Sequence, residues 1–275
     1  FQGTPQELIS AVQRGYLYQG QWNGRRQIYR GSATWGIPAA RFITFLQNHD
    51  QVANSLNGRR IQSYTSPGRL RALTTLMLLA PQTPLLFMGQ EFCSSQPFLY
   101  FADHHEELSK VIRQGRAESL HQFQTARSPE MNLFFADPGS IETFEKCKLD
   151  WQQYETNHEV VDMHRDLLRL RKSDPVFSRQ DATTIHGAVL AAEAFALRYH
   201  GPDGDDRLLI VNLGRDLYWN NLAEPLLAPR QGTDWSLLFS TGNPRYGGPG
   251  IGILDTQRWH VPGHAALVLQ PVGVT

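Results

Sequence analysis

The sequence predicts an α/β region over residues 1–175, followed by a small antiparallel all-β domain over residues 176–275. In the first region, helical patterns alternate with two nearly continuous apolar runs, as in parallel strands that are covered on both faces. After Pro175 the pattern changes to short strand-like runs separated by turn residues. Alternating helices and strands followed by strands alone indicate two structural parts.

The first helix is predicted to begin at Thr4-Pro5-Gln6-Glu7, with Thr4 as N-cap and Pro5 at the first helical position, and to end at Gly15. A polar, aromatic loop follows, and then "RFITFLQ" (41–47) is typical of a buried strand. Ser66-Pro67 begins the next helix, and "PLLFMG" (84–89) is the second apolar run.

The segment 92–156 is expected to be irregular, with one helix near 106–124. Residues 157–175 predict an amphipathic helix whose basic residues gather at its C-terminal end, where the helix dipole favours them. In the all-β part, two strand-like runs around Asp203-Gly204 predict a hairpin, and "RWHVPGHAALVLQP" (258–271) indicates another pair of strands.

Composition excludes several classes of partner. The 275 residues carry no formal net charge, with 41% hydrophobic and 19% charged residues, and basic residues occur only in short pairs such as Arg25-Arg26 and Arg59-Arg60, which are usually solvated surface. We therefore expect neither nucleic acid nor a membrane as a partner. The two cysteines form no disulfide framework or metal motif, so a cytoplasmic location is the default expectation.

Polar residues follow both apolar runs of the α/β region. Gln47, Asn48, His49, Asp50 and Gln51 end the first run, and Gln90-Glu91 end the second. In parallel α/β folds, chemistry is carried out at the C-terminal ends of the strands. Asn and Asp also favour turns, but five polar residues in a row exceed what a turn needs. The pattern favours a functional site at this strand end.

Other motifs are weaker. "DHHEE" (103–107) contains residues that could bind a metal but lacks the spacing of a zinc motif, and no nucleophile elbow, Walker loop or dinucleotide fingerprint is present. The aromatic loop with Tyr16, Tyr18 and Trp22 is either ordinary packing or a platform on which a sugar ring stacks.

The segment "FLQNHDQVAN" (45–54) resembles the last signature motif of the α-amylase superfamily, where an Asn-His-Asp triplet closes barrel strand seven. Seven stretches, in order along the chain, resemble the maltooligosyltrehalose trehalohydrolase family of that superfamily: "LQNHDQ", "GRRI", "LLFMGQEF", "PFLYFADHHEEL", "GRAES", "TFEKCKLDW" and "YGGPG". The resemblance implies the C-terminal part of a (β/α)₈ barrel, with strands seven and eight, followed by a β-sandwich.

The resemblance also implies a reaction and residue roles. The family hydrolyses the α-1,4 bond next to a terminal trehalose unit of maltooligosyltrehalose, without a cofactor or metal, by the retaining two-carboxylate mechanism. Asp50 matches neither of those carboxylates but a third, which stabilises the transition state through sugar hydroxyls. His49 matches a substrate-binding histidine, and Gln51 and Asn48 are expected beside the sugar, although Asn48 is as well suited to brace the strand end. Glu91 is expected to be structural, and Ala53 stands where the family more often has Gly.

The nucleophile and the acid/base of this superfamily lie at barrel strands four and five, and no Asp or Glu of this chain matches their motifs. We therefore expect the chain to be a C-terminal portion whose partner is the missing N-terminal barrel segment, and to be inactive alone. Leu46 and Phe87 are then expected to be exposed. The alternatives are a non-catalytic carbohydrate-binding fragment and another α-amylase-superfamily activity.

Overall fold

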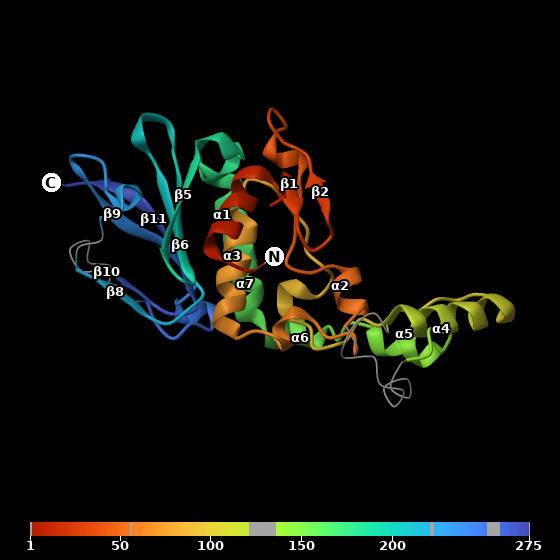
Figure 1. The fold of residues 1–275 in the computed structure, drawn as a ribbon. Helices are drawn as coiled ribbons and strands as arrows, with labels where there is room; N and C mark the ends of the chain where they lie inside the picture. The colour runs from red at the N-terminus through yellow and green to blue at the C-terminus, as the bar shows by residue number, and fades with distance from the viewer. Residues whose placement is uncertain (1, 56, 121–135, 221–222, 252–258, 275) are drawn as a thin grey trace. The chain divides into compact units, whose positions relative to one another are not determined.

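The computed structural model describes residues 2–55, 57–120, 136–220, 223–251 and 259–274 (Figure 1). The chain divides into two compact units. Unit 1 comprises residues 1–44, 66–85 and 162–275, and unit 2 comprises residues 45–65 and 86–161. These limits differ from the boundary expected near residue 175, because helices from the first half of the chain pack on the C-terminal sheet.

Unit 1 is built on a five-stranded antiparallel sheet. Its strands lie in the order β5 (Ile185–Ala191), β6 (Ala194–Tyr199), β7 (Arg207–Asn212), β11 (Ala265–Gly273) and β9 (Thr233–Ser240). The hairpin expected around Asp203-Gly204 is confirmed as β6 and β7, and so is the antiparallel C-terminal part as a whole. The segment 258–271 contains two strands, as expected, but they do not pair with each other: β10 (Trp259–Val261) pairs with β8 (Leu217–Trp219), whereas β11 pairs with β7 and β9.

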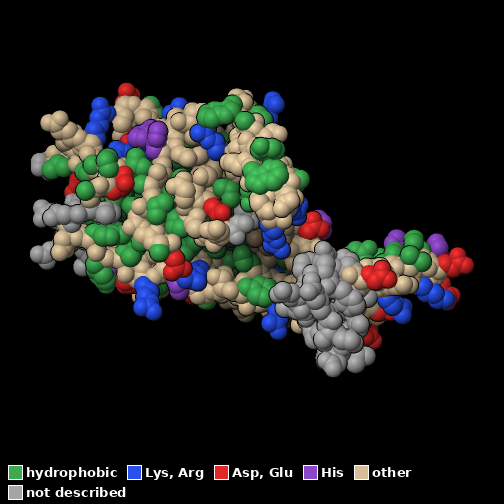
Figure 2. Space-filling view, in the orientation of Figure 1, with side chains coloured by type: hydrophobic (Ala, Val, Ile, Leu, Met, Phe, Trp, Pro, Cys, Tyr) green, Lys and Arg blue, Asp and Glu red, His purple; other side chains and the backbone are tan. Residues whose placement is uncertain are grey.

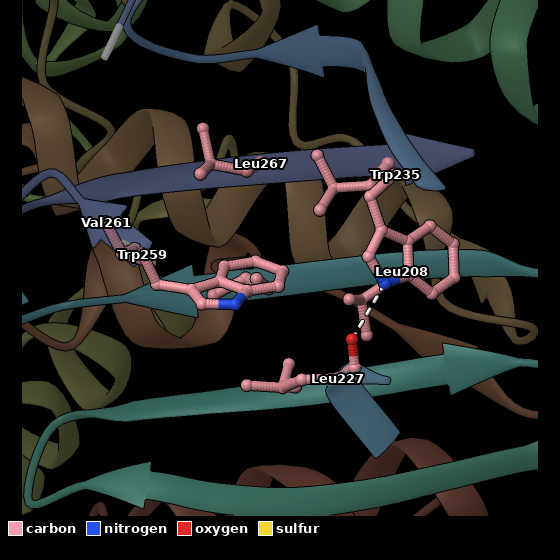
Figure 3. Packing of buried hydrophobic residues seen from close by; sticks show 9 residues of the cluster. Leu208, Leu227, Trp235, Trp259, Val261 and Leu267 are labelled. Carbon is pink, nitrogen blue, oxygen red and sulfur yellow. Dashed lines mark hydrogen bonds between the residues drawn. The ribbon is translucent and has the colours of Figure 1, made fainter. Parts of the chain in front are cut away.

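Both faces of this sheet are covered. The helices α1 (Pro5–Arg14) and α3 (Pro67–Leu79) pack on one face, α1 against β5 and β6 and α3 against β7 and β11 (Figure 1). On the other face lies an apolar core in which the Trp235 indole donates to the Leu227 carbonyl at 2.8 Å (Figure 3). Since side chains alternate between the faces of a strand, this cover accounts for the burial of all six residues of β7.

The helix boundaries follow their predicted caps. The Thr4 side chain accepts from the backbone N–H of Glu7 at the start of α1, and Gly15, with φ of 83°, ends that helix. The Ser66 side chain accepts from the N–H of Arg69 at the start of α3. The predicted amphipathic helix is α7 (His158–Ser173), whose Met163 is fully buried. Local capping chemistry was therefore sufficient to place these ends.

The two apolar runs of the first half give shorter strands than expected. They pair in parallel, as predicted, but β3 spans only Ile43–Thr44 and β4 only Thr83–Pro84. The expectation that the first run is buried on both faces is wrong, because Ile43 is 60% exposed in a strand that has a single neighbour. The expected exposure of Phe87 is also wrong: it is 9% exposed and packs edge-on against Phe98.

Unit 2 is made of short helices joined by loops. Among its described residues the α-helices are α2 (His49–Ala53), α4 (Glu106–Leu120), α5 (Ile141–Cys147) and α6 (Gln152–Thr156), and the first residues of α7 also belong to it. The helix expected near 106–124 is confirmed as far as residue 120, and residues 121–124 lie outside the described residues. The buried Phe92 contacts both Trp151 and Tyr154.

The aromatic loop of unit 1 contains a hairpin that the sequence did not predict. Strands β1 (Gln19–Asn23) and β2 (Ile28–Gly31) pair antiparallel and carry exposed apolar side chains, including Tyr29 at 75%. Figure 2 shows Lys and Arg side chains interspersed with Asp and Glu side chains over the visible face, as expected for a chain without net charge. Among the described helices, none is long and apolar enough to cross a membrane.

Candidate active site

Three of the five polar side chains at the end of the first apolar run accept hydrogen bonds from backbone N–H groups. The Asn48 side chain accepts from the N–H of Asp50 at 2.8 Å, and the Gln51 side chain accepts from the N–H of Asn48 at 2.9 Å, which is a reciprocal capping box at the start of α2. The buried Gln47 accepts from the N–H of Ile61 at 2.9 Å. Asn48 thus braces the turn, which is one of the two roles expected for it, and the expected place of Asn48 and Gln51 beside a sugar stays a prediction.

The other two residues of this polar run are His49 and Asp50. Their side chains are 68% and 70% exposed, and His49 Nε2 lies 3.4 Å from Asp50 Oδ1. A carboxylate beside an imidazole, both open to solvent, offers a hydrogen-bond acceptor and a donor at adjacent positions. The site is therefore an exposed pair on a capped turn, and neither side chain lines one of the two cavities described for this chain.

Arg60 holds the far end of the loop that begins at this pair. Its guanidinium donates to the carbonyls of Gln96 at 2.6 Å and Met88 at 2.7 Å and lies over the Phe87 ring. The expectation that Arg59-Arg60 is solvated surface is wrong for Arg60, which is 2% exposed. Burial lowers the pKa of Arg60, and the nearby Glu91 opposes that shift. Glu91 therefore has an electrostatic role beside a structural cation.

A second arginine holds the end of α2. Arg116 donates to the side chain of Asn54 and to the carbonyl of Ala53, and its guanidinium lies over the Tyr100 ring. Burial lowers the pKa of Arg116. Ala53 lies inside the helix, so it requires no glycine. The Arg116 contacts thus fix the C-terminal end of the short helix that carries His49 and Asp50.

The aromatic residues proposed as a platform are placed in unit 1, before β3. Tyr16 packs against Phe42, Tyr18 lies beneath Arg30, and Trp22 meets Tyr29 edge-on at 5.2 Å. Asn48 to Gln51 belong to unit 2, after β3. The described contacts do not bring Tyr16, Tyr18 or Trp22 together with Asp50, and their binding role stays a prediction.

Sequence reasoning missed the two arginine clamps and the capping box. The capping box had a signal, because Asn48 and Gln51 have the spacing of an N-cap and its partner. The arginines had none, because nothing local distinguishes the buried Arg60 from the exposed Arg59. Of the "DHHEE" residues, His105 lies near the N–H of Leu108 at 3.5 Å, and the described residues contain no group suited to a metal ion.

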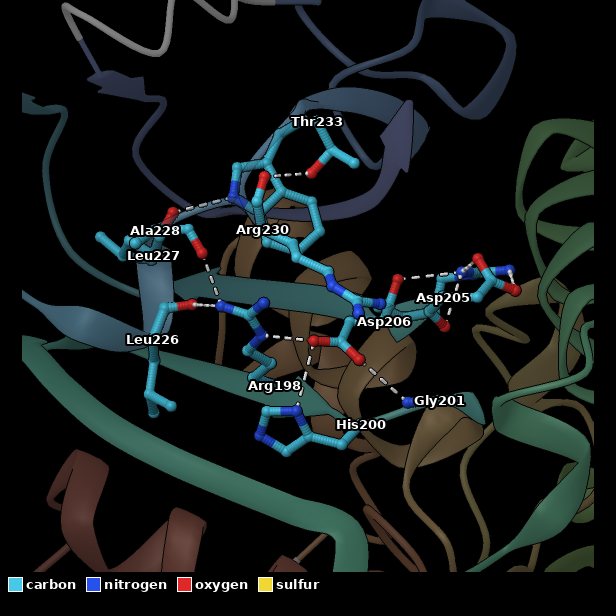
Figure 4. A network of polar contacts seen from close by, with 12 residues as sticks. Arg198, His200, Gly201, Asp205, Asp206, Leu226, Leu227, Ala228, Arg230 and Thr233 are labelled. Atoms are coloured by element: carbon cyan, nitrogen blue, oxygen red, sulfur yellow. Dashed lines mark hydrogen bonds and ion pairs between the residues drawn. The ribbon is translucent and has the colours of Figure 1, made fainter. Parts of the chain in front are cut away.

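A buried polar network in unit 1 is a second cluster with reactive residue types. Asp206, 5% exposed, bonds Arg198 at 2.8 Å and His200 at 3.2 Å and accepts from the N–H of Gly201 (Figure 4). Arg198 also donates to the carbonyl of Ala228 at 2.6 Å. The carboxylate and the guanidinium are both satisfied by the fold, which indicates that this cluster joins β6 and β7 to the neighbouring loop.

Comparison with known proteins identifies relatives of this chain. A family model described as "Domain of unknown function (DUF3459)" matches residues 183–268, which contain β5 to β10 and the first part of β11. The malto-oligosyltrehalose trehalohydrolase of Deinococcus radiodurans is 33% identical over 224 residues, covering 78% of this chain and 36% of that protein. The enzyme of the same name from Arthrobacter ramosus is 34% identical over 173 residues, covering 62% of this chain and 29% of its own length. The chain is a homologue of the C-terminal region of malto-oligosyltrehalose trehalohydrolases.

A solved structure extends the likeness to the fold. A candidate alpha amylase from Salmonella typhimurium superimposes with a TM-score of 0.74 at 29% identity, covering 97% of this chain and 41% of that protein. The relatives are thus α-amylase-type hydrolases by name, and the chain spans about a third of the length of the curated trehalohydrolases it matches.

Proposed function

We propose that this chain provides the sugar-binding carboxylate Asp50 and the histidine His49 of a retaining glycoside hydrolase. The reaction is hydrolysis of the α-1,4 bond next to the terminal trehalose unit of maltooligosyltrehalose, which releases trehalose. The observation that carries the proposal is the exposed His49–Asp50 pair on a turn whose other polar side chains are engaged by the backbone. In parallel α/β folds the residues that follow a strand supply the functional groups, and this pair follows β3.

Asp50 would act on the transition state and not on the bond itself. An ionised carboxylate accepts strong hydrogen bonds from sugar hydroxyls. Its negative charge also stabilises a ring that acquires oxocarbenium character, a gain that is larger in the transition state than in the ground state. His49, adjacent at 3.4 Å, would donate to a hydroxyl of the same sugar and fix its orientation.

The nucleophile and the acid/base would come from a barrel segment outside these 275 residues. One observation supports this part of the proposal: the curated relatives are about three times as long as the matching region.

The test is reconstitution. The chain is joined to the segment that precedes the aligned region in the Deinococcus radiodurans relative, and trehalose release from maltooligosyltrehalose is measured. We expect activity in the joined enzyme, none in the isolated chain, and a loss of about 100-fold or more in kcat for Asp50→Asn.

Asp103→Asn is the matched control, because Asp103 is an exposed acid of the same unit that lies outside the turn. This variant should keep the full rate. If Asp50→Asn also kept the full rate, the role of Asp50 would be wrong. Release of glucose or maltose in place of trehalose would indicate another α-amylase-type activity, and saccharide binding without turnover in the joined protein would indicate a binding fragment.

A further inference from the structure

A cavity in unit 1, separate from the proposed active site, has the properties of a small-molecule site. Its volume is about 420 Å³, and its walls come from the end of α1, the loop 34–42 and the residues that lead into β5. This volume lies within the range of roughly 300–1,000 Å³ that ligand pockets occupy. The lining residues used below are Gln13, Arg14, Trp35, Thr183 and His186.

The wall contains an aromatic ring that is exposed and held in place. Trp35 is 75% exposed, and the Arg14 guanidinium lies 4.2 Å from its ring centroid. A cation over one face restrains the indole without covering all of its surface. The adjacent Thr34 is buried, and its hydroxyl donates to the carbonyl of Arg14 at 3.0 Å. The ring is thus presented to solvent on an anchored loop.

The polar groups of the wall have hydrogen-bonding capacity left. The Gln13 amide nitrogen donates to the carbonyl of Ile185 at 2.9 Å, which leaves the amide oxygen as an acceptor. The Thr183 hydroxyl donates to Asp181 and keeps its lone pairs. His186 is exposed and supplies both a donor and an acceptor. An aromatic face with several uncharged polar groups around it suits a ligand that has an apolar face and a hydroxyl rim.

Most of the polar groups that line this cavity are uncharged. Among the described residues that line the cavity, Arg14 is the one with a permanent charge, and its guanidinium is engaged with Trp35. The cavity also adjoins the C-terminal end of α1, where the helix dipole is negative.

We infer that this cavity is a second saccharide site, which binds a neutral hexose oligosaccharide by stacking a sugar ring on Trp35. The inference goes beyond the proposed hydrolysis, because every residue of this cavity lies in unit 1, whereas Asp50 lies in unit 2. The site would hold a glucan chain on the protein without taking part in bond cleavage.

The test is titration of the full chain with maltotriose by calorimetry and by the indole NMR signals. We expect saturable binding, a shifted Trp35 indole signal, and an affinity at least about tenfold weaker in Trp35→Ala. Trp35→Tyr keeps an aromatic face and should bind within a few-fold of the unmodified chain. Trp151→Ala removes another exposed tryptophan, from unit 2, and should leave the affinity unchanged.

Further binding measurements distinguish this site from the proposed active site. Asp50→Asn should leave maltotriose binding at Trp35 unchanged; if it abolished all binding while Trp35→Ala had no effect, the second site would be wrong and the proposed function would stand. Cellotriose and trehalose report which linkages fit. Absence of maltotriose binding at millimolar concentration, or tighter binding of inorganic phosphate than of any saccharide at Trp35, would overturn the inference.

Discussion

At the scale of residues, the polar run after the first apolar segment separates into two roles. Gln47, Asn48 and Gln51 satisfy backbone N–H groups, whereas His49 and Asp50 face solvent. The residue types alone could not make this separation, because amide side chains serve equally well as caps and as ligand donors. The sequence therefore predicts a site in this run, and the hydrogen bonds separate the residues that bond the backbone from the two that face solvent.

Arg60 gives a prediction at this scale. Arg60→Met removes the donor of two part-buried hydrogen bonds, to the carbonyls of Met88 and Gln96. Because each unmade buried hydrogen bond costs about 1–3 kcal/mol, we expect the free energy of unfolding to fall by about 2–4 kcal/mol. Urea denaturation followed by circular dichroism measures this change.

Arg59→Met is the control, since Arg59 is exposed and adjacent. It should change the stability by no more than about 0.5 kcal/mol. Equal effects of the two substitutions would show that the buried clamp contributes nothing specific.

At the scale of elements, the stretch "YGGPG" has a structural explanation. Gly248 approaches the backbone of Gly242 so closely that a Cβ would lie 2.3 Å from its carbonyl carbon, and Gly250 donates to the Gly242 carbonyl at 2.8 Å. The Tyr246 hydroxyl donates to Asp166 on α7 at 2.8 Å, and its ring stacks on Phe239. These residues close the turn after β9 and join it to a helix.

Tyr246 gives a prediction of pH dependence. Burial and the hydrogen bond to Asp166 raise its pKa to about 12, above the value of about 10 expected in the unfolded chain. A raised folded pKa contributes stability that is complete below about pH 10 and is lost as the pH rises towards 12. The stability of the unmodified chain should therefore fall more steeply between about pH 10 and 12 than that of Tyr246→Phe.

Chemical denaturation at a series of pH values tests this difference. Tyr218→Phe, at a tyrosine that is 69% exposed, should retain the steep fall of the unmodified chain. Parallel curves for the unmodified chain and Tyr246→Phe would contradict the assignment.

The elements that the sequence predicted best are those that begin or end at a capping residue or a turn residue. The caps at Thr4 and Ser66 and the turn at Asp203-Gly204 specify their boundaries locally. The apolar run 41–47 was misjudged for a different reason. Its strand pairing depends on neighbours distant in the chain, and with one neighbour only two residues keep ladder geometry. The β1–β2 hairpin was missed because its exposed strands lack an alternating apolar pattern.

At the scale of the whole molecule, the two units differ in how they are held together. The core strands β6, β7 and β11 are buried on both faces, whereas α4 is largely exposed along its described side chains. Because exchange of amide hydrogens follows local stability, the amides of 194–199 and 207–212 should exchange most slowly and those of 106–116 much faster. Hydrogen exchange read by mass spectrometry compares them in one sample, and equal protection would contradict this ranking.

The sequence thus predicted the fold best where a segment packs against neighbouring elements of the same unit. It predicted the fold less well where the structure depends on residues distant in the chain. Both faces of the five-stranded sheet are filled from within unit 1. The candidate site is the opposite case. The resemblance and the position after a strand single out Asp50, but the exposure of its side chain depends on the residues packed around it. No local pattern in the sequence reports those surroundings.

The reciprocal cap around His49 and Asp50 has a consequence for how this turn can be altered. Because neighbouring amide side chains hold the loop in shape, exchanging the acid or the imidazole should change reactivity while the backbone keeps its course. A protein engineer could therefore install other side chains at positions 49 and 50, to suit a different sugar or a different charge, and judge each exchange by its chemistry alone.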